Sequence, residues 1–144
     1  MNNHDTIELM KECGCGIKTG VSSLTDLVDK AESPALKKLI SQSISKHEEL
    51  ESQVSRILAD SSECAKQPPM MAKSMSWMKT EMKMAMYDTD STVAALVTDG
   101  CGMGIKTLRQ NLNDYPRAST EAKGIVEQVI NEENSLMESV ARYL

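Results

Sequence analysis

Apolar residues return every third or fourth position along most of the chain, and this spacing constrains the fold more than any other feature. In the first segment they form the seam Ile7, Met10, Gly14, Ile17, Val21, Leu24 and Val28. An α-helix turns once every 3.6 residues, so this spacing gathers the apolar side chains on one narrow stripe. Such a stripe is typical of helices that pack together in a bundle. Further stripes run from Leu36 to Ile57, Met70 to Tyr87, Val93 to Leu112 and Ala122 to Tyr143.

Composition favours helices over sheets and excludes several classes of protein. Aromatic residues make up 3% of the 144 residues and Phe is absent, whereas β-strands draw on aromatic and β-branched side chains. The net charge of −5 argues against general nucleic-acid binding, which needs a basic face. No apolar run is long enough to span a membrane, and no signal peptide is visible. Four cysteines are too few for a disulfide scaffold. Because neither a membrane span nor a signal peptide is visible, we expect a cytoplasmic protein.

Capping and proline signals divide the chain into helices. Asp5 followed by Glu8 predicts the start of the first helix, as a variant of the capping box. Ser33 followed by Pro34 predicts an N-cap and the first residue of the second helix. Pro68 and its neighbouring proline end any helix that reaches them.

An internal repeat organises these helices. The heptapeptide CGCGIKT at 13–19 recurs as CGMGIKT at 101–107, an offset of 88, and beyond the following turn the matching offset is 86. A length difference in a turn is tolerated, whereas one inside a helix is not. We therefore expect one domain over residues 1–144, with hairpins at about 5–62 and 89–144 and a connector helix at about 68–88. Two such hairpins with a long crossover form an all-α four-helix bundle of the ferritin-like kind.

The chain resembles the ferritin-like superfamily, and specifically its small, uncharacterised bacterial bundle proteins. The resemblance covers nearly the whole chain and rests on the repeated Gly-Ile-Lys-Thr motif, on Ser76-Trp77-Met78 and on Asp99-Gly100-Cys101. It implies a four-helix bundle. Working members of the superfamily hold two irons with one Glu from each of two helices and a Glu-x-x-His motif from each of the others.

This sequence lacks that di-iron signature. No carboxylate occupies 17–22 in the first helix or 105–109 in the fourth. Ile44 stands three residues before His47, and Ile130 stands three before Glu133, where the motif requires Glu. We therefore expect neither a cofactor nor catalytic residues, and nothing supports an oxidoreductase.

The sequence predicts a polar layer at the centre of the bundle instead. His47 and Glu133 are repeat equivalents, because they share the offset of 86, and both lie on apolar seams. Buried charges are costly unless they are paired, so we predict ion pairs that fix the register of the helices. The predicted layer comprises Lys18, His47, Glu48, Lys106, Glu132 and Glu133. Two alternatives are a single divalent metal ion on His47, Glu51 and Glu133, and side chains that simply reach solvent.

Cysteines and glycines in the repeat allow further interpretations. Cys13 and Cys15 could bind a soft metal such as Cu(I) or Zn, but they point about 200° apart on a helix, so we interpret them as small packing residues. Met103 replaces Cys15 in the second copy. The glycine pairs Gly16/Gly20 and Gly100/Gly104 have the four-residue spacing that permits close approach of helices.

Seven of the 11 methionines lie between residues 70 and 86. Their stripe invites a copper or membrane-surface interpretation, yet flexible Met side chains ordinarily fill irregular packing surfaces. We expect this segment to cover the flank of the bundle or to pack on a second copy. The interface candidates are Met71, Met75, Trp77, Met78 and Met82.

The sequence thus predicts a non-enzymatic ferritin-like bundle with a structural, stress-associated or partner-binding role. Its partner is a second copy, in a homodimer, or another protein; no nucleic acid and no membrane span are expected. The alternative function is iron or copper handling through the central His/Glu layer or the Met and Cys residues.

Overall fold

The computed structural model describes residues 3–64 and 89–144, which form an all-α bundle as predicted. The elements are α1 (His4–Val28), α2 (Pro34–Asp60), α4 (Thr89–Asp114), α5 (Thr120–Val140) and the short 3-10 helix η1 (Ala141–Tyr143). None of these helices is both long and apolar enough to cross a membrane. The predicted connector helix at about 68–88 lies outside the described residues, and so do its interface candidates Met71, Met75, Trp77, Met78 and Met82.

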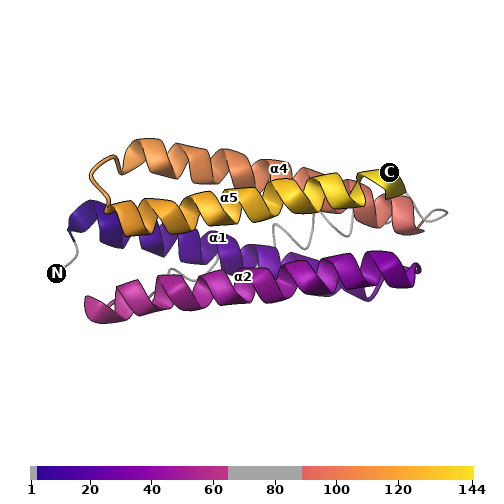
Figure 1. The fold of residues 1–144 in the computed structure, drawn as a ribbon, viewed down its shortest axis with the longest axis horizontal. Coiled ribbons are helices and arrows are strands. Elements are labelled where there is room, and N and C mark those ends of the chain that lie inside the picture. Colours follow the sequence, from indigo (N-terminus) through magenta and orange to yellow (C-terminus); the bar gives the residue numbers. More distant parts are fainter. Residues whose placement is uncertain (1–2, 65–88) are drawn as a thin grey trace.

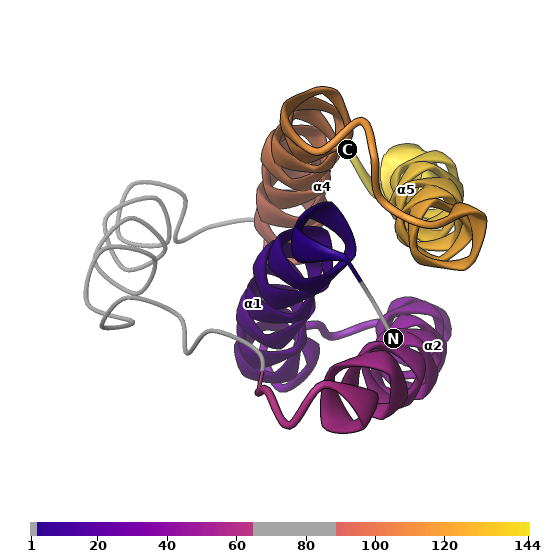
Figure 2. The same ribbon diagram turned by 90° about the vertical axis from the view of Figure 1, so that its left-hand side faces the viewer.

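The four helices run roughly along one axis in two directions (Figure 1). Helices α1 and α5 run one way, and α2 and α4 run the other way. Seen along the axis, α1 packs beside α2 and α4, and α5 packs beside the same two helices (Figure 2). Each hairpin is therefore antiparallel, and the hairpins meet through antiparallel contacts between α2 and α5 and between α1 and α4.

Helix α1 begins differently from the prediction. Its N-cap is Asn3, whose side chain accepts a hydrogen bond from the backbone N–H of Thr6 at 2.8 Å. The carboxylate of Asp5 instead accepts a hydrogen bond from the backbone N–H of Arg117, in the α4–α5 turn, at 2.8 Å. The predicted capping box at Asp5 is therefore wrong, because a contact across the bundle takes up that side chain.

The second helix begins as predicted, and its turn is held by the other hairpin. Ser33 is the N-cap of α2 and Pro34 is its first residue. The carboxylate of Asp90, in the first turn of α4, accepts hydrogen bonds from the backbone N–H groups of Glu32 at 2.7 Å and Ser33 at 3.2 Å. The first helix of each hairpin thus binds the turn of the other hairpin.

The core consists of two apolar clusters in sequence along the bundle. One includes Ile17, Leu50, Leu108 and Ile130, and the other includes Leu24, Ile40, Cys101 and Leu136. On each helix a short stretch separates the buried residues of one cluster from those of the other. These stretches are 18–23 on α1, 41–49 on α2, 102–107 on α4 and 131–135 on α5. These four stretches form the central layer of the bundle.

Burial shows how the two hairpins correspond. Buried residues of α2 and α5 match at the offset of 86, as in the pairs Leu36/Ala122, Ile40/Val126, Leu50/Leu136 and Val54/Val140. Those of α1 and α4 match at 84, as in Leu9/Val93, Cys13/Val97, Ile17/Cys101 and Leu24/Leu108. The repeated heptapeptide is therefore displaced by one helical turn between the hairpins, since four residues are close to one turn.

Candidate functional site: a buried histidine–glutamate pair

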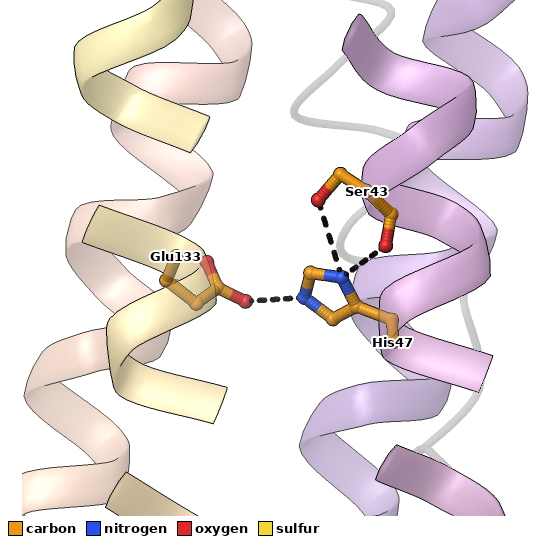
Figure 3. A network of polar contacts seen from close by, with 3 residues as sticks. All are labelled: Ser43, His47 and Glu133. Carbon is orange, nitrogen blue, oxygen red and sulfur yellow. Dashed lines mark hydrogen bonds and ion pairs between the residues drawn. The ribbon is translucent and has the colours of Figure 1, made fainter. Parts of the chain in front are cut away.

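Two side chains meet in the central layer. His47 extends from α2 and Glu133 from α5, and the imidazole Nε2 lies 3.0 Å from the carboxylate Oε1 (Figure 3). His47 is 0% exposed and Glu133 is 9% exposed. Both residues occupy seam positions between buried apolar residues, so the spacing that builds the core also carries these polar groups into it.

The contacts of the imidazole determine where its protons lie. Nδ1 is 2.8 Å from the backbone carbonyl oxygen of Ser43 and 3.3 Å from the Ser43 hydroxyl (Figure 3). A carbonyl oxygen can only accept, so Nδ1 carries a hydrogen and donates it. A second proton must then lie between Nε2 and the Glu133 carboxylate, because otherwise two acceptors would face each other. The pair therefore holds one shared proton.

The electrostatic surroundings favour the histidine as the carrier of that proton. Burial lowers the pKa of His47, but the hydrogen bond and negative charge of Glu133, the Ser43 carbonyl and the charge of Glu132 outweigh it, and the net pKa is raised. The pair is accordingly an imidazolium that donates to a carboxylate. Charge-assisted hydrogen bonds of this kind are stronger than neutral ones.

Glycines on the other two helices face the pair. A Cβ added to Gly20 of α1 would lie 3.7 Å from His47 Cδ2, and one added to Gly104 of α4 would lie 3.5 Å from Glu133 Oε2. A Cβ on Gly16 or on Gly100 would meet nothing within 4 Å, so only one glycine of each predicted pair lies close to another helix. Gly20 and Gly104 are the glycines that adjoin the pair.

Glu132 lies at the solvent side of the layer. Burial raises its pKa, and the charges of His47 and Lys46 and a hydrogen bond from Ser43 oppose this shift. Glu132 also lines a shallow groove of about 280 Å³ between α2 and α5, whose walls are Lys46, Glu49, Leu50, Gln128, Asn131 and Glu132. The lining includes the chain neighbours of the pair, Lys46 and Glu132, but neither His47 nor Glu133 itself.

The predicted polar layer is smaller than expected. Glu48 and Lys106 are exposed, and Lys18 is partly exposed. Glu48 follows His47 by one residue, which turns its side chain about 100° away from the seam. Lys106 follows Gly104 by two residues and so points away from the centre. The buried part of the layer is His47 with Glu133.

Ser43 was not among the predicted site residues, although its seam position four residues before His47 was visible in the sequence. The signal that identifies its role is this spacing, because residues four apart lie on the same face of a helix.

The geometry does not favour the predicted alternative of a metal on His47, Glu51 and Glu133. Within residues 3–64 and 89–144, no group of three or more His, Cys, Asp or Glu side chains could hold a metal ion. Glu51 is partly exposed. A metal ligand needs a free imidazole lone pair, and both ring nitrogens of His47 carry hydrogens in the pair.

The four cysteines differ in exposure, and burial determines how easily their thiols ionise. Cys13 and Cys101 are buried, Cys15 is partly exposed and Cys64 is exposed. Burial raises the pKa of Cys13 to about 12. Burial, with the nearby Glu133 carboxylate, likewise raises the pKa of Cys101. A thiolate is disfavoured at both buried positions, which does not suit a nucleophile or a soft-metal ligand.

Comparison of the chain with protein-family models, with curated proteins and with solved structures finds no match.

Proposed function

We propose that this protein is a non-enzymatic four-helix bundle of ferritin-like arrangement, in which a structural ion pair takes the central position of a metal site. Its role is that of a structural, stress-associated or partner-binding protein of the cytoplasm. The observation that carries the proposal is the 3.0 Å contact between His47 Nε2 and Glu133 Oε1, in which both imidazole nitrogens are committed.

The directions of the helices support the ferritin-like arrangement. Parallel α2 and α4 are what a bundle with one long crossover requires, and antiparallel α1–α2 and α4–α5 are its two hairpins (Figure 1). At the centre, Gly20 and Gly104 face the pair where a di-iron protein would present carboxylates. Ile44 and Ile130 occupy the Glu positions of the Glu-x-x-His motif.

The pair itself supports a structural role. One buried polar contact in an apolar interface can fix the register of two helices, because any slip leaves a buried group unpaired. His47 and Glu133 join α2 to α5 and thereby join the two hairpins. The polar outer faces of the helices stay available for a protein partner.

Metal analysis tests the proposal. Protein purified without chelator is expected to contain less than one equivalent of iron, copper or zinc, and to melt at the same temperature with and without EDTA. The matched variant His47→Ala should have the same metal content as the unsubstituted protein. Stoichiometric metal that disappears in His47→Ala would contradict the structural role and establish metal handling.

A further inference from the structure

The ion pair lies on the axis that relates the two hairpins. His47 and Glu133 are equivalent positions of the repeat, and they contact each other across the antiparallel helices α2 and α5. Two antiparallel helices bring equivalent positions into contact only at the point where their local two-fold axis passes. The equivalent apolar positions Ile40/Val126 and Leu50/Leu136 are all buried, and the two members of each lie in opposite clusters, as a two-fold axis through the ion pair requires.

This position has a consequence for partner choice. If two copies of the α1–α2 hairpin packed in the same way, His47 would meet a second His47. If two copies of the α4–α5 hairpin did so, Glu133 would meet a second Glu133. The apolar residues would tolerate either arrangement, because both seams consist of aliphatic side chains apart from Ser43 and the ion pair itself.

The chemistry of the polar pair distinguishes these arrangements. Two histidines whose Nδ1–H groups are bound to backbone carbonyls would meet through two Nε2 atoms, so the pair would either have no proton between these atoms or carry an uncompensated positive charge in the core. Two buried carboxylates about 3 Å apart cannot both stay ionised. Only the unlike pair supplies one donor and one acceptor with opposite charges.

We propose that His47 and Glu133 form a pairing code, by which the α1–α2 hairpin accepts an α4–α5 hairpin and rejects a second copy of itself. The occupant of each hairpin's inner face is thus the unlike hairpin. The code selects the folded single bundle against assemblies of like hairpins, which the repeated apolar seams would otherwise permit. Such opposition to the wrong partner is a common source of specificity.

A charge swap tests the code, because a glycine faces each member of the pair and a backbone carbonyl lies four residues before each, although Cys101, which hydrogen-bonds Glu133, corresponds to Ile17. Gly20 and Gly104 leave comparable space beside the two side chains. The Val129 carbonyl lies four residues before position 133, as the Ser43 carbonyl lies four before position 47. A histidine at position 133 can therefore make the Nδ1 contact that His47 makes now.

The experiment compares full-length His47→Glu, Glu133→His and the double variant H47E/E133H by urea unfolding. Each single variant creates a like pair and should lower the folding equilibrium constant strongly. The double variant should be at least about tenfold more stable than the product of the two single effects predicts. The matched control E48N/N134E exchanges the side chains at positions 48 and 134, which are repeat equivalents on the exposed faces of α2 and α5. No such coupling is expected there.

Two results would overturn the code. In the first, the folding equilibrium constant of the double variant equals the product of the two single effects. In the second, the exposed control E48N/N134E shows coupling as large as that of H47E/E133H. If neither single variant folds, the two are unfolded, mixed and refolded together. By exchange of hairpins, the new glutamate of the H47E chain can then meet the new histidine of the E133H chain. Recovery of helical circular dichroism in the mixture supports the code, and no recovery contradicts it.

Discussion

Removing one member of the buried pair should be far more harmful than removing both. In Glu133→Leu, His47 stays buried at 0% exposure and loses the acceptor of its Nε2 proton. Breaking a buried ion pair in this way costs about 3–5 kcal/mol. We expect the lower end, about 3 kcal/mol, because a neutral imidazole keeps its Nδ1–H bond to the Ser43 carbonyl and leaves only Nε2 unsatisfied.

The double variant H47L/E133L serves as the control. Both polar groups are gone, and the Ser43 carbonyl retains the backbone N–H of residue 47 as its helical partner. Replacing a whole buried pair by apolar residues is often neutral or stabilising by about 1–4 kcal/mol. We therefore expect the double variant to be at least as stable as the unsubstituted protein.

Urea unfolding followed by circular dichroism measures both effects. With a slope of about 1–3 kcal/mol per molar urea, a loss of about 3 kcal/mol moves the midpoint down by roughly 1–3 M. A single variant that loses less than about 1 kcal/mol would refute this reasoning. So would a double variant that is as unstable as the single one, since the loss would then come from packing.

Alkaline pH, two glycine substitutions and loss of one capping carboxylate each have a predicted effect on stability. Because the pKa of His47 in the folded protein is raised from 6.5, the contribution of the ion pair to stability is fully present below pH 6.5 and is lost as pH rises through the folded pKa. The urea midpoint should therefore fall from pH 6 to pH 9, and it should fall less in H47L/E133L. Gly16→Ala and Gly102→Ala should each stabilise by about 0.5–1 kcal/mol, since both glycines are helical with open space at Cβ; an unchanged or lower melting temperature would contradict this. Asp90→Ala removes two hydrogen bonds to the α1–α2 turn and should cost about 1–3 kcal/mol, with a smaller loss in Asp90→Asn; equal losses in both variants would argue against hydrogen bonding as the cause.

The sequence predicted α2 and α5 well, because a single periodic seam determined which residues are buried. The residues that recur at this spacing in α2 are all buried, namely Leu36, Ile40, Ser43, His47, Leu50, Val54 and Ile57. His47 and Glu133, paired as repeat equivalents, do meet. This part succeeded because a residue's place on a helical stripe depends only on the residues near it in the chain.

What the sequence could not predict depended on packing between helices. The carboxylate of Asp5 binds the distant α4–α5 turn, and no local pattern reveals that turn's proximity. Lys106 was matched to Lys18 through the repeated heptapeptide, but the buried residues of α1 and α4 correspond one helical turn away from that match. Which turn faces the centre is decided by how the hairpins pack.

The protonation state of His47 is the most direct test of a central ion pair in place of a metal site. Nitrogen-15 NMR at pH 7 would report both ring nitrogens in the protein as purified and after addition of Fe²⁺ or Zn²⁺, with Zn²⁺ as the diamagnetic probe. We predict hydrogens on both Nδ1 and Nε2, and spectra that do not change with metal. An Nε2 without a hydrogen whose resonance shifts stoichiometrically with Zn²⁺ would contradict the account.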